Sequence, residues 1–473
     1  MVRKTKIVCT IGPATESAEM LELLARKGMN VARLNTSHGD VESHRARIRT
    51  IKKVRDQLSL PIAILLDLSG PKLRTGDFCD DLIELKEGQE FILTTDKIVG
   101  DASRVSVNYE RLPKEVSEGD EILLDDGKVK LVVTNVKASE IYTRVEDKGQ
   151  ITHRRGINIP GAELGISAVT EKDERFIELG AQEEVDFFAL SFVRKPDDVK
   201  KARRMQESLD IDIPIISKIE TKGALHCIEE IAQVSDGLMV ARGDLGVEIP
   251  VEEVPIAQKR IIRAGNLRRI PVITATQMLE SMIENPVPTR AETTDISNAI
   301  LDGTDAVMLS AETSIGKYPD RAVSVMHRTA LSTESYFYKN PYLLSWTREH
   351  TPVDDDTTAI CMASWTISES LGLKLIVTST FSGHTARNVS GLRPCSHILA
   401  MTPNQKTYYL LALVWGVTPV ISLPSSNTDE IIDAAGKKAR SMGIVQKGEV
   451  FILTAGIPPG VKNTTNILKI ERV

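Results

Sequence analysis

The feature that most constrains the fold of this chain is an alternation of short apolar segments with amphipathic ones. Eight β-rich apolar segments occur, at residues 6–12, 29–34, 62–68, 185–192, 214–220, 237–244, 271–277 and 306–312. Amphipathic segments lie between most of them, at residues 18–27, 44–57, 196–209 and 252–268 among others. Near-continuous apolar strands that alternate with helices predict a parallel sheet covered on both faces. Eight is the number of strands that closes a (β/α)8 barrel, so we predict an α/β protein built on a TIM barrel. An open doubly wound sheet is the alternative, but no G-x-G-x-x-G follows the first strand.

Two segments do not follow this alternation, and they divide the chain into three predicted domains. The gap between the third and fourth apolar segments holds short alternating runs separated by Gly, Asp and Asn, which indicate a small all-β domain. After residue 342 the pattern becomes that of a separate α/β domain of about five strands. We therefore predict a catalytic barrel at residues 1–70 and 169–342, an inserted β-barrel domain at 71–168, and a C-terminal α/β domain at 343–473.

Composition excludes several classes of protein. No run approaches eighteen apolar residues, and the N-terminal residues lack the pattern of a secretory signal, so we expect a soluble cytoplasmic protein. The formal net charge of −6 disfavours nucleic acid as a partner. The five cysteines have no C-x-x-C spacing, which argues against a zinc site or a disulfide framework.

Polar residues gather where the predicted barrel strands end, which is the rim that carries catalytic groups in such barrels. Lys218 and Glu220 are two residues apart on a strand, so both side chains point to the same face, and Ile219 points to the other. A buried cation and anion must be paired, hydrogen-bonded or bound to a metal. Spacing alone leaves two interpretations open, a structural ion pair and an active centre.

Two carboxylates, Glu220 and Asp244, end neighbouring strands about 5 Å apart. Oxygen ligands at that separation suit Mg²⁺ or Mn²⁺, which completes its shell with water and with substrate oxygens. Lys218, Arg33 and Arg74 would neutralise phosphoryl oxygens nearby. The glycines at 243 and 246 would let backbone N–H groups approach an anion, although a plain strand-to-helix turn explains them as well.

The sequence resembles the pyruvate kinase family over essentially its whole length. The resemblance rests on TKIVCTIGP at 5–13, NVARLN at 30–35, SHG at 37–39, ISKIE at 216–220, MVARGDLGVE at 239–248, ATQML at 275–279 and DGTDAVMLS at 302–310. It implies transfer of the phosphoryl group of phosphoenolpyruvate to ADP, giving pyruvate and ATP, with Mg²⁺ or Mn²⁺ as cofactor. The family also implies a homotetramer, and an inserted domain that closes as a lid and excludes water.

The resemblance also implies roles for single residues. Glu220 and Asp244 would hold the divalent cation, and Lys218 would stabilise the transferring phosphoryl group and the enolate. Arg33 would bind the substrate phosphate, while Gly243, Asp244 and Thr276 would hold the carboxylate end, with Thr276 near the proton delivered to the enolate. Arg74, Arg155 and His38 would contact the nucleotide; Arg155 stands where the family often has Lys.

One segment, residues 66–74, departs from the family pattern. Potassium-dependent members usually read Asp-Thr-Lys-Gly-Pro-Glu there, whereas this chain has Leu68 for Thr, Ser69 for Lys and Lys72 for Glu. The departure resembles the potassium-independent branch, so we predict that Lys72 replaces K⁺. The other residues of the family's K⁺ site, Asn35, Ser37 and Asp67, are retained.

The C-terminal domain contains a run of hydroxyl residues at a predicted strand-to-helix turn. Its residues are Thr378, Ser379, Thr380, Ser382, Gly383, His384 and Thr385. Hydroxyls and free N–H groups at a helix N-terminus suit a phosphate, and ordinary N-capping is the alternative. In the family this loop resembles the effector site, which implies allosteric regulation by a sugar phosphate or a nucleotide monophosphate.

Two other functions share parts of this pattern. A Mg²⁺-dependent C–C lyase that uses pyruvate would need neither the inserted domain nor a nucleotide. A non-catalytic regulator on the same scaffold would not need Lys218, Glu220, Asp244 and Thr276 together.

Overall fold

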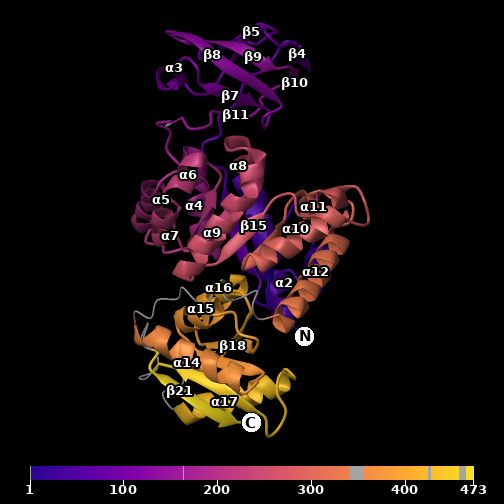
Figure 1. Ribbon diagram of the computed structural model, residues 1–473, viewed down its shortest axis with the longest axis vertical. Helices are drawn as coiled ribbons and strands as arrows, with labels where there is room; N and C mark the ends of the chain where they lie inside the picture. Colours follow the sequence, from indigo (N-terminus) through magenta and orange to yellow (C-terminus); the bar gives the residue numbers. More distant parts are fainter. Residues whose placement is uncertain (1, 163, 341–354, 424–427, 457–464) are drawn as a thin grey trace.

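The computed structural model describes residues 2–162, 164–340, 355–423, 428–456 and 465–473. Its three parts are stacked along the longest axis, with the inserted β segment at one end, the barrel in the middle and the C-terminal α/β part at the other end (Figure 1). The domain limits at 71 and 168 remain a prediction, and the limit at 343 lies outside the described residues.

The barrel is closed by eight parallel strands, which confirms the predicted fold. They are β1 (Lys6–Thr10), β2 (Val31–Asn35), β3 (Ala63–Leu68), β12 (Phe187–Val193), β13 (Ile215–Ile219), β14 (Gly237–Ala241), β15 (Val272–Ala275) and β16 (Ala306–Leu309). The helices between and after them are α1 (Ala18–Lys27), α2 (Val41–Leu58), α4 (Glu171–Gln182), α5 (Pro196–Ser208), α6 (Lys222–His226), α7 (Ile228–Val234), α8 (Arg242–Glu248), α9 (Val254–Arg268), α10 (Arg290–Leu301), α11 (Ala311–Ser314) and α12 (Pro319–Lys339).

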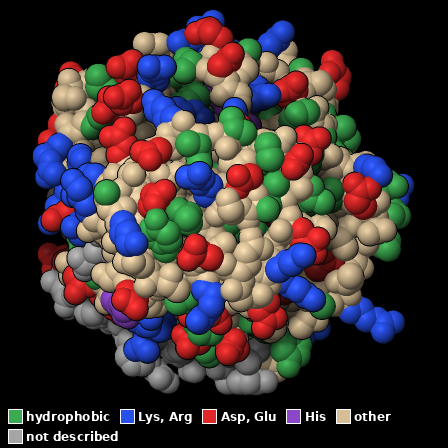
Figure 2. Space-filling view, turned by 90° about the horizontal axis from the view of Figure 1, so that it is seen from above, with side chains coloured by type: hydrophobic (Ala, Val, Ile, Leu, Met, Phe, Trp, Pro, Cys, Tyr) green, Lys and Arg blue, Asp and Glu red, His purple; other side chains and the backbone are tan. Residues whose placement is uncertain are grey.

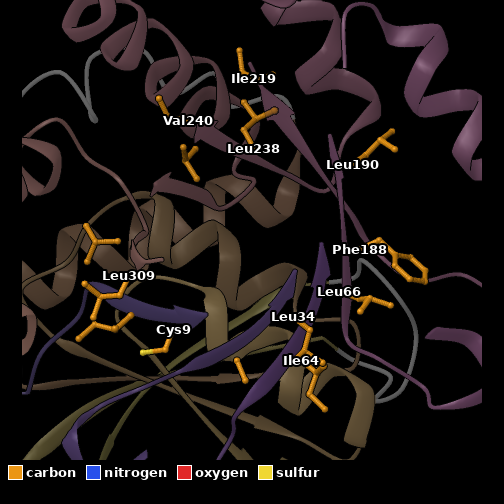
Figure 3. Close-up of a cluster of buried hydrophobic side chains, with 14 of the residues drawn as sticks. Cys9, Leu34, Ile64, Leu66, Phe188, Leu190, Ile219, Leu238, Val240 and Leu309 are labelled. Atoms are coloured by element: carbon orange, nitrogen blue, oxygen red, sulfur yellow. The ribbon is translucent and has the colours of Figure 1, made fainter. Parts of the chain in front are cut away.

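Alternation along the strands separates two hydrophobic clusters. Side chains such as Leu66, Phe188 and Leu190 belong to the large cluster that includes the surrounding helices (Figure 3). Their neighbours Leu65 and Ala189 belong to a second, smaller cluster. On β13 the same parity divides Ile219 of the large cluster from Ile216 of the small one. Lys218 has the parity of Ile216, so it points to the barrel interior as predicted.

The inserted segment is all β apart from one short helix. Its elements are β4 (Ile83–Leu85), β5 (Glu90–Thr94), β6 (Arg104–Ser106), α3 (Leu112–Glu115), β7 (Glu121–Leu124), β8 (Val129–Lys137), β9 (Glu140–Asp147), β10 (Gly149–Ile151) and β11 (Ile157–Asn158). The strands pair as a six-stranded sheet, β11-β7-β8-β9-β5-β6, and a separate pair, β10-β4. Isolated bridges join Arg74 to Gly156 beside β11 and Thr75 to Val107 beside β6, so the two edge strands are linked, as the predicted β-barrel requires. The strands β4, β6, β10 and β11 could not be predicted from the sequence, because strands of two or three residues show no periodicity.

The C-terminal part is the predicted five-stranded α/β unit. It contains α14 (Asp356–Ser370), β17 (Leu375–Ser379), α15 (His384–Gly391), β18 (His397–Thr402), α16 (Gln405–Leu410), β19 (Val417–Ile421), α17 (Thr428–Ser441), β20 (Val450–Ala455) and β21 (Ile467–Arg472). The strand order is β19-β18-β17-β20-β21, with only β21 antiparallel. Pro419, which has no N–H to donate, is tolerated because β19 is an edge strand.

The surface carries both signs of charge. Seen from above the inserted segment, Lys and Arg side chains are interspersed with Asp and Glu side chains (Figure 2). Among the helices that the structure describes, none combines the length and the hydropathy needed to span a membrane.

Two lysines from the start of the chain join the barrel to the C-terminal part. Lys6 Nζ donates to the carbonyl oxygen of Val417 at 2.6 Å, and Lys4 Nζ donates to the carbonyl oxygen of Pro394 at 2.5 Å. Both residues are buried. Burial lowers the pKa of Lys6 to about 7 and that of Lys4 to about 8. Arg3 further lowers the pKa of Lys6, while Glu334 and Asp305 oppose the shift.

These pKa values predict a pH-dependent stability. The unfolded chain holds the Lys6 proton up to about pH 10.4, whereas the folded chain releases it near pH 7, so stability should rise between these limits. One proton contributes up to about 1.4 kcal/mol per pH unit. Thermal melts from pH 7 to pH 9.5 should therefore show a smaller rise of Tm in Lys6→Met than in the unsubstituted protein. An equal rise in both proteins would contradict this role of Lys6.

Candidate active site

Five polar side chains meet at the carboxyl ends of four neighbouring barrel strands. Arg33 comes from β2, Asp67 from β3, Ser191 from β12 and Lys218 from β13, and Glu220 directly follows β13. The parallel register places Asn35 opposite Asp67, so the ends of β2 and β3 are level. The predicted rim is thus a connected cluster in the structure.

Asp67 lies at the centre of this cluster. Its Oδ2 accepts a hydrogen bond from Arg33 Nε at 2.7 Å, and its Oδ1 lies 3.4 Å from Lys218 Nζ. The Asp67 side chain is 1% exposed. Burial raises the pKa of such a carboxyl, but Lys218 and then Arg33 outweigh burial, so the pKa of Asp67 falls below its ordinary value. Asp67 therefore stays ionised and holds both cations.

Lys218 has three partners at the rim. Its Nζ donates to Ser191 Oγ at 2.7 Å and lies 2.8 Å from Glu220 Oε1, in addition to its contact with Asp67. Burial lowers the pKa of Lys218, but the charges of Asp67 and Glu220 raise it further than burial lowers it, so the group is ionised. The ion pair between Lys218 and Glu220 thus exists, but as part of a larger network.

Glu220 is held in position by an unusual backbone geometry. Its Oε2 accepts a hydrogen bond from the backbone N–H of Phe192 at 2.7 Å. Phe192 has a φ of +53°, a conformation that bulky residues rarely adopt, at an irregularity in the register between β12 and β13. Such strain concentrates at functional sites, where the surrounding structure holds it in place.

Asp244 lies in the first turn of α8, because β14 ends at Ala241 and the helix starts at Arg242. The expectation that Asp244 ends a strand is therefore wrong. Burial raises the pKa of Glu220, and the charge of Asp244 raises it further, against the effect of Lys218. The two carboxylates are thus close enough to repel each other.

The charges at this rim do not balance. Three carboxylates, those of Asp67, Glu220 and Asp244, face two cations, Arg33 and Lys218, which leaves one negative charge unmatched. A divalent cation at Glu220 and Asp244 would relieve their repulsion, so these residues fit such an ion. Within the described part of the chain, no group of three or more His, Cys, Asp or Glu side chains could hold a metal. The ion would need further oxygens from substrate or water.

Thr276, which directly follows β15, lies at the same rim. Its Oγ1 accepts a hydrogen bond from the N–H of Gly243 at 2.9 Å and donates to the carbonyl oxygen of Ala275 at 2.6 Å. Thr276 and Gln277 have φ values of +69° and +54°. A β-branched residue in this region is strained, so Thr276 is the second strained point of the site.

The predicted monovalent-cation residues are only partly gathered. Asn35 Oδ1 accepts from the N–H of Ser37 at 3.1 Å, and Leu68 offers its carbonyl oxygen to Ser191 Oγ at 2.7 Å. Asp67 is ion-paired with Arg33 and Lys218. Among the described residues no ion pair joins Lys72 to Asp67. The Lys72 side chain instead lies beside Gly156 of the inserted segment, where a Cβ added to this glycine would be 3.1 Å from Lys72 Cε.

The predicted nucleotide residues lie in two places. Arg74 and Arg155 belong to the inserted segment, where Arg74 Nη1 donates to the carbonyl oxygen of Arg154 at 3.0 Å and Arg155 Nη1 lies 3.6 Å from Asp125 Oδ1. His38 is exposed on the loop after β2, and its carbonyl oxygen faces His44 Nε2 at 2.8 Å. No hydrogen bond or ion pair joins the two groups within the described residues.

The hydroxyl-rich loop runs from β17 into α15. The N-cap of α15 is Gly383, with a φ of +81° and no side-chain hydrogen bond to the helix, so no Ser or Thr side chain caps it. Thr380 Oγ1 accepts from the N–H of Gly383 at 3.0 Å, and Thr385 Oγ1 lies 2.6 Å from Thr465 Oγ1. The Thr378 hydroxyl is buried and has no hydrogen-bond partner among the described residues. Ser379, Ser382 and His384 are partly exposed.

Sequence reasoning missed two residues that hold the cluster together. Ser191 Oγ bridges Lys218 and the carbonyl oxygen of Leu68, and Thr10 Oγ1 accepts from Arg33 Nη1 at 2.8 Å. Ser191 is the only polar residue in β12, at its carboxyl end, and that position was a usable signal. A threonine at the end of β1 gave no such signal, because threonine is common in strands.

Comparison with family models identifies two regions. Residues 2–323 match the model described as pyruvate kinase, barrel domain, and residues 358–471 match the model described as pyruvate kinase, alpha/beta domain. Together they cover more than half of the chain.

Individual relatives agree with these models. The chain is 50% identical to a pyruvate kinase of Thermotoga maritima over 475 residues, covering 99% of this chain and all of the relative. It is 48% identical to a pyruvate kinase of Staphylococcus epidermidis, covering all of this chain and 81% of the relative. The crystal structure of a pyruvate kinase from Cryptosporidium parvum matches with a TM-score of 0.93 at 38% identity, covering 99% of this chain and 96% of that one. The chain therefore belongs to the pyruvate kinase family.

Proposed function

We propose that this enzyme transfers the phosphoryl group of phosphoenolpyruvate to ADP, giving pyruvate and ATP in the last step of glycolysis. The observation that carries the proposal is the buried cluster of Arg33, Lys218 and Glu220 around Asp67. The cluster holds two cations in fixed positions beside carboxylates that carry one negative charge more than these cations balance. Phosphoryl transfer depends on positioning and on dispersed positive charge more than on covalent chemistry.

In this mechanism Arg33 binds the phosphate of phosphoenolpyruvate, and Lys218 stabilises the phosphoryl group in transfer and the enolate that it leaves. Glu220 and Asp244 hold Mg²⁺ or Mn²⁺, which when bound neutralises phosphoryl and enolate oxygens. Gly243, Asp244 and Thr276 hold the carboxylate end of the substrate. The enolate is protonated beside Thr276.

The inserted segment acts as a lid that carries Arg74 and Arg155 to the nucleotide, while His38 meets it from the barrel rim. This role needs the inserted segment to approach the rim, because no hydrogen bond or ion pair joins Arg74 or Arg155 to His38 within the described residues. Closure would exclude the water that otherwise hydrolyses the phosphoryl group. A lyase would need no such lid, and a non-catalytic regulator would need no ionised lysine held in a network of carboxylates.

We also propose that K⁺ is not required and that Lys72 takes its place when the lid closes. The support is the ammonium at residue 72, where potassium-dependent relatives usually have Glu, since an ammonium competes with K⁺ for the same charge. Asn35, Ser37, Asp67 and the carbonyl of Leu68 would then surround the Lys72 ammonium or a weakly bound K⁺.

The loop of residues 378–385 is proposed to bind the phosphate of an effector, a sugar phosphate or a nucleotide monophosphate. Its support, within the part of the chain that the structure describes, is a helix N-terminus without a side-chain cap and a buried hydroxyl without a partner. A rise of Tm with one member of a metabolite panel tests this site.

We further propose that the protein is a cytoplasmic homotetramer. Exposed apolar side chains such as Val287 and Ile256 are suited to subunit contacts. Sedimentation tests the number of subunits.

The proposed activity predicts ATP formation from phosphoenolpyruvate, ADP and Mg²⁺ in a coupled assay. Lys218→Met should lower kcat by about 100- to 1,000-fold, because the charge that stabilises the transition state is lost. Lys130→Met is the matched control, since it removes a lysine that pairs with Glu121 in the inserted segment and should leave kcat unchanged. Equal rates for Lys218→Met and the control would refute the role of Lys218.

The proposed role of Lys72 predicts activity without K⁺. In a K⁺-free buffer the unsubstituted enzyme should reach nearly its full rate, and K⁺ should add little. Lys72→Glu should lose roughly tenfold in kcat without K⁺ and regain it when K⁺ is added, because the acidic group restores the missing cation's site. Strong activation of the unsubstituted enzyme by K⁺ would overturn the proposal.

A further inference from the structure

The turn after β15 is strained, and the strain falls on the residue that we assign to enolate protonation. Thr276 and Gln277 both have left-handed φ values. For residues other than glycine this conformation is less stable than an ordinary one. A conformation of this kind persists only where surrounding groups hold it.

Arg242 is the group that holds this turn. Its Nη2 donates to the carbonyl oxygen of Thr276 at 2.6 Å, and its Nε donates to the carbonyl oxygen of Ala275 at 3.2 Å. One edge of the guanidinium therefore binds two consecutive carbonyls with two donors fixed in one plane. Arg242 is the first residue of α8, so it reaches the turn from the neighbouring strand.

The other edge of the guanidinium is held by a carboxylate. Arg242 Nη1 donates to Asp295 Oδ1 of α10 at 2.7 Å and to Gln258 Oε1 of α9 at 3.4 Å. The Arg242 side chain is only 11% exposed. Each of its three nitrogens thus donates a hydrogen bond within the protein.

The same contacts set the place of the Thr276 hydroxyl. Thr276 Oγ1 shares the carbonyl oxygen of Ala275 with Arg242 Nε and accepts from the N–H of Gly243, the residue after Arg242. A shift of Arg242 would therefore move both the backbone and the hydroxyl of Thr276. A displacement of about 1 Å at a reacting group can cost about 100-fold in rate.

We infer that Arg242, oriented by Asp295, is a positioning residue for the proton-transfer step at Thr276. The inference rests on the proposed function and on the proposed place of Thr276 in it. In that step the C2=C3 electron pair of the enolate forms a C–H bond with a proton, and the C2 oxygen becomes a carbonyl. The O–H bond of the proton donor at Thr276 breaks, and the solvent returns a proton to this donor. Arg242 does not touch the substrate.

The test separates protonation from phosphoryl transfer. Exchange of the pyruvate methyl protons in D2O, with Mg²⁺ and ATP, is followed by ¹H NMR and reports the proton step. Single-turnover ATP formation from phosphoenolpyruvate and ADP reports phosphoryl transfer. Arg242→Lys keeps the charge but loses the fork, so exchange should fall by about 10- to 100-fold. ATP formation in a single turnover should change by less than about threefold, because Lys218 and Arg33 are untouched.

Three further variants make the outcomes distinct. Asp295→Asn should lower exchange in the same direction and serves if Arg242→Lys does not fold. Arg55→Lys is the matched control, since Arg55 also joins a carboxylate, Asp186 at 2.8 Å, to a backbone carbonyl, that of Ile62, and should leave exchange unchanged. Thr276→Val removes the hydroxyl itself.

Loss of exchange in both Arg242→Lys and Thr276→Val supports the inference. Loss in Thr276→Val alone overturns the positioning role of Arg242 and leaves the role of Thr276 intact. Normal exchange in both variants overturns the assignment of Thr276 and the inference with it. ATP formation by the unsubstituted enzyme, measured in the same experiment, shows separately whether the proposed function holds.

Discussion

The buried carboxylate of Asp67 is the interaction on which the site depends. A carboxylate that is 1% exposed is costly unless it is paired, and Asp67 is paired with Arg33 and Lys218 at once. Because the three groups come from three different strands, the pairing also holds the ends of β2, β3 and β13 to a common geometry. Phosphoryl transfer requires cations at fixed positions, and Asp67 supplies that constraint without contributing to the chemistry itself.

The barrel and two strained turns complete the arrangement. Lys218 occupies an inward-facing position near the end of β13, which places its side chain at the rim. The irregular register at Phe192 turns the N–H of this residue toward Glu220. On the next strands, the left-handed turn at Thr276 brings its hydroxyl to Gly243 at the start of α8. The strain at both points is offset by hydrogen bonds from neighbouring elements, which is the pattern expected where geometry serves function rather than stability.

Much of the fold and part of the candidate site could be predicted from the sequence, for identifiable reasons. The eight strands were visible because long apolar segments alternate with amphipathic ones, and the facing of Lys218 and Glu220 follows from a spacing of two. The short strands of the inserted segment, the left-handed turns and the helical position of Asp244 could not be predicted in this way. They depend on contacts between residues far apart in the chain, as when Arg242 binds the carbonyl of Thr276. Ser191 was missed although its position in β12 was a usable signal, and its contacts with Lys218 and Leu68 are visible only in the structure.

The most direct test of this account is the kcat of Asp67→Asn, measured on protein whose circular dichroism shows a native fold. Asparagine keeps the size of the side chain but removes the charge that orients Arg33 and Lys218. The account predicts a loss of about 100-fold or more in phosphoryl transfer to ADP, because the two cations lose their common anchor. A folded Asp67→Asn enzyme with kcat close to that of the unsubstituted protein would contradict it.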